Sequence, residues 1–289
     1  MKHLLTFLRF ARLHTVIGTS LSITALYFIA GRRLDHWDWP LLGFTLLACL
    51  AANVYITGLN QITDVEIDRI NKPYLPLASE AYSMQTGKMI VMICLLISLV
   101  VAAFFRPYLL ATVLLSLLLG TAYSLPPVRL KRFYFWAAFC ILAVRGLIVN
   151  LLLYLHFQYS LGGGHRIPAV IWLLTGLIFT FSIVIAWFKD LPDTEGDAAY
   201  KIDTLSIKLG REKVWTMGSY LLGISLLGGA TYCLINGLAL LAIGQLFLVI
   251  VLIMLNRQLK LDNQASIARF YQQIWVLFFG EYLLFAMFG

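Results

Sequence analysis

Two short acidic windows carry the side chains with the clearest capacity for chemistry. The first runs from Asn60 to Asp68, the second runs from Asp190 to Asp197, and each borders a long apolar segment. They hold seven of the 14 acidic residues in the chain: Asp64, Glu66, Asp68, Asp190, Asp193, Glu195 and Asp197. Carboxylates this close together resist ionisation unless a cation neutralises them, and hard divalent cations prefer oxygen ligands. The windows therefore predict metal-assisted chemistry on an anionic, lipid-soluble substrate.

The spacing of the acids is the same in both windows. Asn60, Asp64 and Asp68 recur every four residues, as do Asp193 and Asp197. Side chains four residues apart project from one face of a helix. Two such faces, opposed across a cavity, would hold divalent ions. The alternative is that the acids are solvated loop ends of membrane spans, but the repeated spacing favours the metal-binding interpretation.

Composition places the chain in a membrane. It is 61% hydrophobic and only 12% charged, with a mean hydropathy of +0.84, whereas soluble domains carry roughly 25% charged residues. We therefore predict one polytopic all-α membrane domain over residues 1–289, in contact with membrane lipid. The net charge of +8 does not indicate nucleic-acid binding, because no soluble basic face is present to carry it. The sequence identifies no protein partner.

The apolar runs predict nine transmembrane helices. They are 13–30, 41–59, 88–105, 108–123, 134–157, 169–188, 214–235, 238–256 and 270–288. Lys and Arg then divide into 17 on one side and four on the other, with Arg145 inside a span. Because positive charge accumulates on the cytoplasmic side, the N-terminus and both acidic windows are predicted to be cytoplasmic and the C-terminus to lie opposite. The N-terminus does not read as a cleaved signal or a transit peptide, which favours a bacterial inner or thylakoid membrane.

Basic residues flank the acidic windows. Arg69 and Lys72 follow the first, Lys189 precedes the second, and Arg129 and Lys131 lie in a further loop on the same predicted side. Cations beside metal-binding carboxylates are expected if the shared ligand is a diphosphate. The alternative is that these cations only enforce the membrane topology.

Arg145 is the one charge within a predicted span, where a charge costs at least ~2.5 kcal/mol. It should face the interior of the helix bundle and pair with a structural partner or with an acidic substrate group. Asn150 follows five residues later. His14 begins the first span, where a polar contact is more common than a catalytic role. Tyr123 ends the fourth span, where its ring face could stabilise a carbocation.

These motifs resemble those of the UbiA-type intramembrane prenyltransferase superfamily. Its first motif, N-D-x-x-D-x-x-x-D, is matched by Asn60, Asp64 and Asp68, and its second, D-x-x-x-D, by Asp193 and Asp197, with Asp190 as an additional upstream acid. Gln61 departs from the pattern, which has Asp after the Asn. The resemblance implies a bundle of nine transmembrane helices with a central cavity open to the cytoplasmic side.

The segments 60–79, 123–132, 144–150 and 189–197 resemble the homogentisate prenyltransferase branch of this superfamily. This implies Mg²⁺-dependent transfer of a phytyl group from phytyl diphosphate to homogentisate with decarboxylation, as in tocopherol biosynthesis. The implied catalytic residues are Asp64, Asp68, Asp193 and Asp197, which would hold Mg²⁺, and Asn60, which would orient the diphosphate. The implied substrate-binding residues are His14, Arg69, Lys72, Tyr123, Arg129, Lys131, Arg145, Asn150, Lys189 and Asp190. A chlorophyll-synthase-like or other quinone prenyltransferase is the alternative within this class, and a cation transporter is the alternative outside it.

Overall fold

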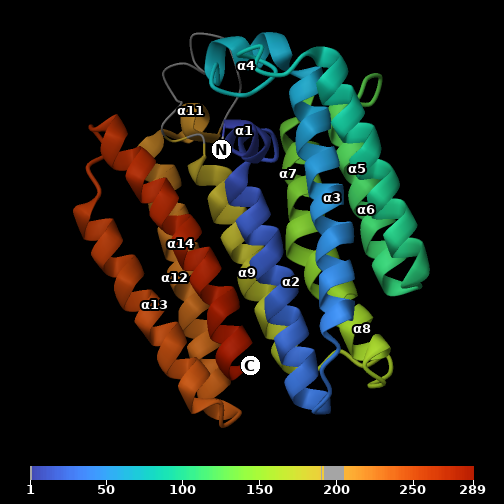
Figure 1. Ribbon diagram of the computed structural model, residues 1–289. Coiled ribbons are helices and arrows are strands. Elements are labelled where there is room, and N and C mark those ends of the chain that lie inside the picture. Colours follow the sequence, from blue (N-terminus) through green and yellow to red (C-terminus); the bar gives the residue numbers. More distant parts are fainter. Residues whose placement is uncertain (1, 190, 192–204) are drawn as a thin grey trace. The chain divides into compact units, whose positions relative to one another are not determined.

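The computed structural model describes residues 2–189, 191 and 205–289, and this part of the chain is helical without strands. The all-α prediction is confirmed. The elements shown in Figure 1 are α1 Lys2–Phe10, α2 Leu13–Leu34, α3 Trp39–Thr63, α4 Val65–Asn71, α5 Met84–Phe104, α6 Tyr108–Ser124, η1 Leu130–Arg132, α7 Tyr134–Leu142, η2 Ala143–Ile148, α8 Val149–Ser160, α9 Ala169–Phe188, α11 Leu205–Leu209, α12 Arg211–Ile235, α13 Ala239–Gln258 and α14 Gln264–Phe288.

Seven described helical segments are long and apolar enough to cross a membrane. They are α2, α3, α5, the run Phe135–Ser160, α9, α12 and α13, while the apolar helix α6 is shorter. Each overlaps an apolar run predicted from the sequence, and helix α14 covers the remaining run, 270–288. The prediction of a multi-pass membrane protein is therefore confirmed, with boundaries that differ by a few residues.

Local sequence explains where several helices begin. The carboxylate of Asp38 accepts a hydrogen bond from the Leu41 amide at 3.0 Å at the start of α3. Ser83 caps α5 and Asn263 caps α14 in the same way, through the amides of Thr86 and Ser266. Each cap satisfies an amide that the first helical turn leaves without a partner.

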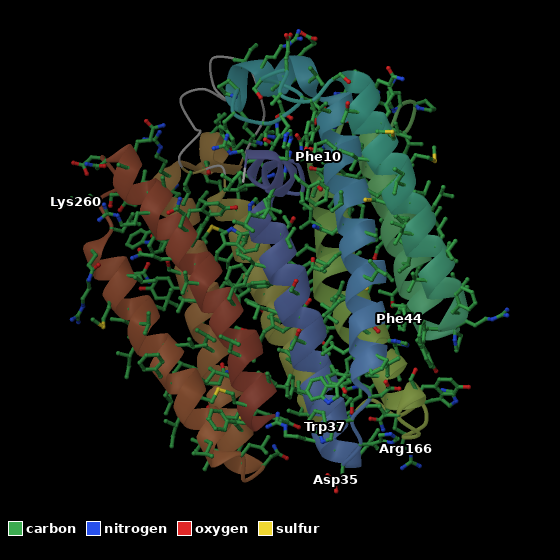
Figure 2. The ribbon with its side chains drawn as sticks, in the orientation of Figure 1. Phe10, Asp35, Trp37, Phe44, Arg166 and Lys260 are labelled. Atoms are coloured by element: carbon green, nitrogen blue, oxygen red, sulfur yellow. The ribbon has the colours of Figure 1, made fainter. Side chains whose placement is uncertain are left out.

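The chain divides into two compact units, of which the first comprises Met1–Cys140 and Leu152–Arg166. Helix α3 is central in this unit and packs against α2, α5 and α6 (Figure 1). Figure 2 shows Phe10 at one end of this unit and Trp37 at the other. A β-carbon on Gly58 would lie 2.7 Å from both Phe10 Cζ and Val91 Cγ2. The absence of a side chain at Gly58 thus lets Phe10 and α5 pack directly against α3.

The second unit comprises Ile141–Leu151 and Ile167–Gly289. Helix α9 packs against α12, α14 and the π-helix η2, and α12 packs against α13. The close approach of η2 to α9 depends on Gly146, where a β-carbon would lie 2.7 Å from Phe179 Cδ2. This unit contains the intramembrane Arg145, on η2.

We predict opposite effects of alanine at two glycines of α3. Gly58→Ala should lower the free energy of unfolding by about 1–3 kcal/mol, because the new methyl group would overpack Phe10 and Val91. Gly43→Ala meets nothing within 4 Å and should stabilise by about 0.5–1 kcal/mol, because alanine restricts the unfolded chain. Melting temperatures of the purified proteins in detergent would check this. Equal shifts for the two variants would contradict the packing account.

Candidate active site

The first acidic window surrounds a break between two helices. Helix α3 ends at Thr63, α4 begins at Val65, and Asp64 between them has φ −120° and ψ 15°. The sequence predicted one continuous helical face through Asn60, Asp64 and Asp68, and the structure differs at this break. The Asn60 amide still donates to Asp64 Oδ2 at 3.2 Å. The Asp68 amide N–H donates to the Asp64 carbonyl at 2.7 Å.

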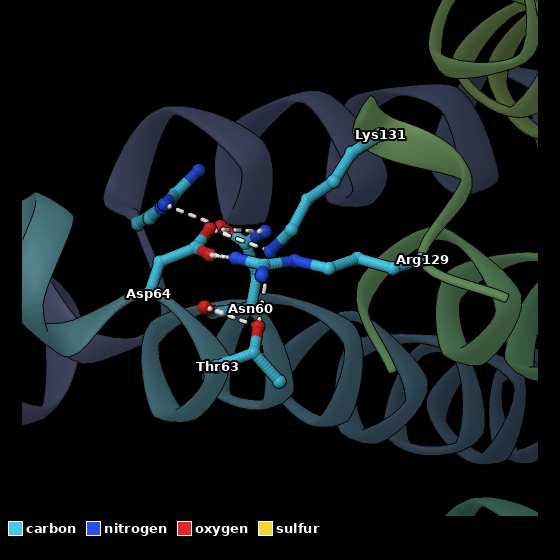
Figure 3. Close-up of polar contacts among 6 residues, drawn as sticks. Asn60, Thr63, Asp64, Arg129 and Lys131 are labelled. Atoms are coloured by element: carbon cyan, nitrogen blue, oxygen red, sulfur yellow. Dashed lines mark hydrogen bonds and ion pairs between the residues drawn. The ribbon is translucent and has the colours of Figure 1, made fainter. Parts of the chain in front are cut away.

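Asp64 is held by two cations from another loop (Figure 3). Arg129 Nη2 donates to Oδ1 at 3.0 Å, and Lys131 Nζ donates to Oδ2 at 2.6 Å. Lys131 also donates to the Thr63 hydroxyl at 3.0 Å. The Asp64 and Lys131 side chains retain only 14% and 12% exposure, so the pair is screened less by water than a surface salt bridge. The positive loop predicted near the acidic window therefore contacts its central carboxylate.

Arg12 adds a third cation, which the sequence analysis counted only as a topological charge. Its Nη2 donates to Asn60 Oδ1 at 2.9 Å. Arg12 lies between α1 and α2 with φ 55°, and Arg129 has φ 37°. The left-handed region is unfavourable for residues other than glycine and is often retained at functional sites. Both left-handed arginines direct their guanidinium groups to the Asn60–Asp64 pair. We name Arg12, Asn60, Asp64, Arg129 and Lys131 the cation cluster.

Gln61, the departure from the family motif, has a structural role. It is buried at 1% exposure, and its Nε2 donates to the Phe10 carbonyl at 2.7 Å. Phe10 ends α1, two residues before Arg12. Gln61 thus links the end of α1 to α3 beside the cation cluster. Its side chain adds no carboxylate to the first acidic window.

Asp68 is the second acid of this window and is 5% exposed, with Oδ2 buried and without a hydrogen-bond partner in the described part of the chain. Burial raises its pKa, while the positive charges of Lys72 and Arg12 act in the opposite direction. Burial also lowers the pKa of Lys131, against the stabilising hydrogen bond from Lys131 to Asp64. Burial therefore makes the charged form of each group less stable than it is in water. A ligand of opposite charge bound beside either group would stabilise that charged form.

The first window fits one part of a divalent-cation site. The buried, unpartnered Asp68 oxygen and the Asp64 carboxylate are oxygen donors of the kind that Mg²⁺ prefers. No group of three or more His, Cys, Asp or Glu side chains within residues 2–189, 191 and 205–289 could hold a metal by itself. Asp190, Asp193 and Asp197 lie outside the described residues.

The other predicted site residues have varied surroundings. Arg69 forms exposed ion pairs with Glu66 at 3.0 Å and Glu80 at 3.1 Å, so its described contacts lie outside the cation cluster. His14 is exposed in the first turn of α2, and Tyr123 lies near the end of α6.

Three further predicted residues belong to the second unit. Lys189 caps the C-terminal end of α9. Arg145 and Asn150 lie at η2 and the start of α8.

Comparisons with known proteins agree with this fold and motif. The family model of the UbiA prenyltransferase family matches residues 20–279. The chain is 45% identical to homogentisate phytyltransferase of Synechocystis sp., covering 97% of this chain and 94% of that protein. It is 40% identical to homogentisate phytyltransferase 1 of Arabidopsis thaliana, over 96% of this chain and 74% of that protein. It is 35% identical to homogentisate geranylgeranyltransferase of Hordeum vulgare, over 98% of this chain and 72% of that protein.

Solved structures show the same fold. A structure of digeranylgeranylglyceryl phosphate synthase gives a TM-score of 0.70 at 21% identity, over 100% of this chain and 99% of that one. A UbiA homologue from Archaeoglobus fulgidus, bound to GPP and Mg²⁺, gives 0.65 at 18% identity, over 98% and 99%. The chain belongs to the UbiA prenyltransferase family, a class of membrane enzymes, as its two acidic motifs predicted.

We predict that Gln61→Leu destabilises the protein by about 1–3 kcal/mol, because the buried Phe10 carbonyl would lose its donor. The end of α1 should then loosen and Arg12 should shift away from Asn60. Melting temperature and hydrogen exchange of α1 would measure both effects. Gln258→Leu, at the exposed end of α13, is the matched control and should change neither. An unchanged melting temperature for Gln61→Leu would refute the fastening role.

Proposed function

We propose that this protein transfers a phytyl group from phytyl diphosphate to homogentisate, with loss of carbon dioxide. The cation cluster carries this proposal, because positive side chains gathered around an acidic motif suit a diphosphate shared with a divalent ion. Family membership and the named activities of the relatives support the same reaction. Relatives named for geranylgeranyl transfer have the same named acceptor, so an assay with several prenyl diphosphates tests the length of the donor tail.

In the proposed site, the cations bind the diphosphate. Arg129 and Lys131 are already oriented toward Asp64, and Arg12 reaches the same group through Asn60. Arginine binds phosphate oxygens through paired N–H donors, and lysine contributes a compact positive charge. Lys72 acts electrostatically on Asp68 and would add charge, and we propose from the sequence pattern that Lys189 does the same. Asn60 would orient the diphosphate.

Asp64 and Asp68 would hold Mg²⁺, and we propose from the sequence motif that Asp193 and Asp197 supply further ligands. When bound, the ion would neutralise the leaving diphosphate. The side-chain cations would stabilise the same developing charge as the carbon–oxygen bond of the donor breaks. The electron-rich ring of homogentisate would attack the allylic carbon. The substituted ring carbon would then lose its proton, and the acetate side chain would lose carbon dioxide and take up a proton, which gives a methylated prenyl quinol.

We also propose that residues 1–289 act as one membrane domain with nine spans and a central cavity open to the cytoplasmic side. The seven long apolar helices, together with α6 and α14, supply the required number. The division of Lys and Arg supports a cytoplasmic N-terminus and a C-terminus on the opposite side. A bacterial inner or thylakoid membrane is the proposed location.

The purified protein, incubated with homogentisate and a set of prenyl diphosphates, should yield a decarboxylated prenyl quinol, with phytyl diphosphate as the best donor. Asp64→Asn should lower kcat/KM by about 100-fold or more, because the cations and metal would lose their central charge. Glu66→Gln is the matched control, since Glu66 is 83% exposed in the next helix turn. Mass spectrometry would identify products. Absence of any homogentisate product in the wild type would refute the proposed acceptor.

Removal of divalent ions should stop turnover reversibly. EDTA should reduce prenyl transfer to background, and added Mg²⁺ in excess should restore it, because two carboxylates and a diphosphate repel one another without a cation. Circular dichroism of the EDTA-treated protein controls for unfolding. Metal-independent turnover would contradict the proposed role of Asp64 and Asp68.

A further inference from the structure

Among the described residues, Arg145 has aromatic neighbours and no anionic partner. Its guanidinium carbon lies 4.7 Å from the ring centroid of Trp275 and 5.9 Å from that of Phe278, both on α14. Within the described residues, its guanidinium forms no hydrogen bond or ion pair. A charge in the middle of the apolar run Phe135–Ser160 is costly, and ring faces compensate only part of that cost. The N–H groups of Arg145 therefore remain available for an acidic ligand.

The backbone around Arg145 is an irregular helical turn that neighbouring side chains stabilise. Arg145 lies in the π-helix η2, and such bulges are frequent at functional sites. The side-chain amide of Asn150 donates to the Gly146 carbonyl at 2.9 Å and to the Arg145 carbonyl at 3.3 Å. The Tyr282 hydroxyl donates to Asn150 Oδ1 at 2.8 Å.

Asn150 therefore has protein partners at both polar atoms and is fully buried. These bonds satisfy the carbonyl groups of the widened turn. This arrangement indicates a supporting role for Asn150, where the sequence predicted contact with substrate.

We propose that Arg145 binds the carboxylate of the aromatic acceptor, and that Asn150 and Tyr282 are positioning residues that maintain its bulge. This inference rests on the proposed function and assigns its acceptor specificity. A guanidinium binds a carboxylate through two parallel hydrogen bonds. The neighbouring Trp275 and Phe278 rings suit the aryl part of the same ligand. The cation cluster differs, because Arg129 and Lys131 pair with Asp64 and, in the described residues, none of its cations lies over an aromatic ring.

The test compares two ligands that differ only in charge. Homogentisate and its primary amide are titrated separately into the purified protein without prenyl diphosphate, so that no transfer occurs. The wild type should bind the acid about 30-fold more tightly than the amide, and Arg145→Met should reduce this ratio to about 3-fold or less. Arg257→Met, at the exposed end of α13, is the matched control and should keep the wild-type ratio. Arg145→Lys should give an intermediate ratio, because it keeps the charge without the planar fork.

The melting temperature of ligand-free Arg145→Met separates binding from folding. Loss of a charge without an anionic partner should leave this temperature unchanged or raise it. A well-folded Arg145→Met protein that still prefers the acid as strongly as the wild type would overturn the proposal. So would a raised KM for the prenyl diphosphate with an unchanged acid-to-amide ratio, because Arg145 would then serve the diphosphate.

Tyr282→Phe tests the positioning role. It should lower the acid-to-amide ratio by about 3- to 10-fold while the KM for the prenyl diphosphate stays unchanged. A lower melting temperature with an unaltered ratio would show a purely structural role and overturn the positioning assignment.

The two proposals fail in different ways. Wild-type protein that prefers the acid but transfers no prenyl group would refute the proposed function and leave the carboxylate site. Prenyl transfer that coexists with an unchanged ratio in Arg145→Met would refute the carboxylate site and leave the function.

Discussion

The ion pairs between Asp64 and the cations Arg129 and Lys131 are the interaction on which the proposed chemistry depends. One partly buried carboxylate neutralises two nearby cations only in part, and Arg12 adds further positive charge through Asn60. The surplus charge suits a diphosphate, whose oxygens can replace the carboxylate as partners of the cations. In the proposed mechanism, the same exchange would free Asp64 to bind a divalent ion beside Asp68. In this proposal, Asp64 and its two cations hold each other in place until substrate and metal bind.

The scaffold around the cluster gives Gln61 a structural contact at the position where the family motif has Asp. The Gln61 side chain, which follows Asn60 in the chain, points toward the Phe10 carbonyl. It lies one helix turn from Gly58, where Phe10 packs against α3. An amide suits this buried contact, because it donates a hydrogen bond without adding a charge. Gln61 thus affects the site indirectly. It holds the end of α1 in place, and with it Arg12, whose backbone is left-handed. A motif difference that could suggest altered metal binding is explained by helix packing.

Sequence reasoning identified the apolar helices well, because long hydrophobic runs are a strong and local signal. It also pointed to Asn60, Asp64, Arg129 and Lys131, which the structure brings into contact, while their roles toward a diphosphate stay predictions. It missed the helix break at Asp64, since the four-residue spacing is equally compatible with a continuous helix. It could not find the role of Arg12, because that contact joins residues 48 positions apart and requires a backbone conformation that no local pattern marks. The π-helix at Arg145 was also missed, because it is stabilised by Asn150 and the distant Tyr282. The roles of Asp193 and Asp197 stay predictions.

The central claim is that the cation cluster binds a diphosphate together with Mg²⁺. The most direct measurement is the affinity of the purified protein for an unreactive prenyl thiodiphosphate, titrated with and without Mg²⁺ and without any acceptor. The account predicts that affinity falls by about 100-fold or more when Mg²⁺ is absent, because the analogue then meets unneutralised carboxylates. Removing the charge of Asp64 should abolish the dependence on Mg²⁺. Tight binding that is indifferent both to Mg²⁺ and to the charge of Asp64 would contradict the account.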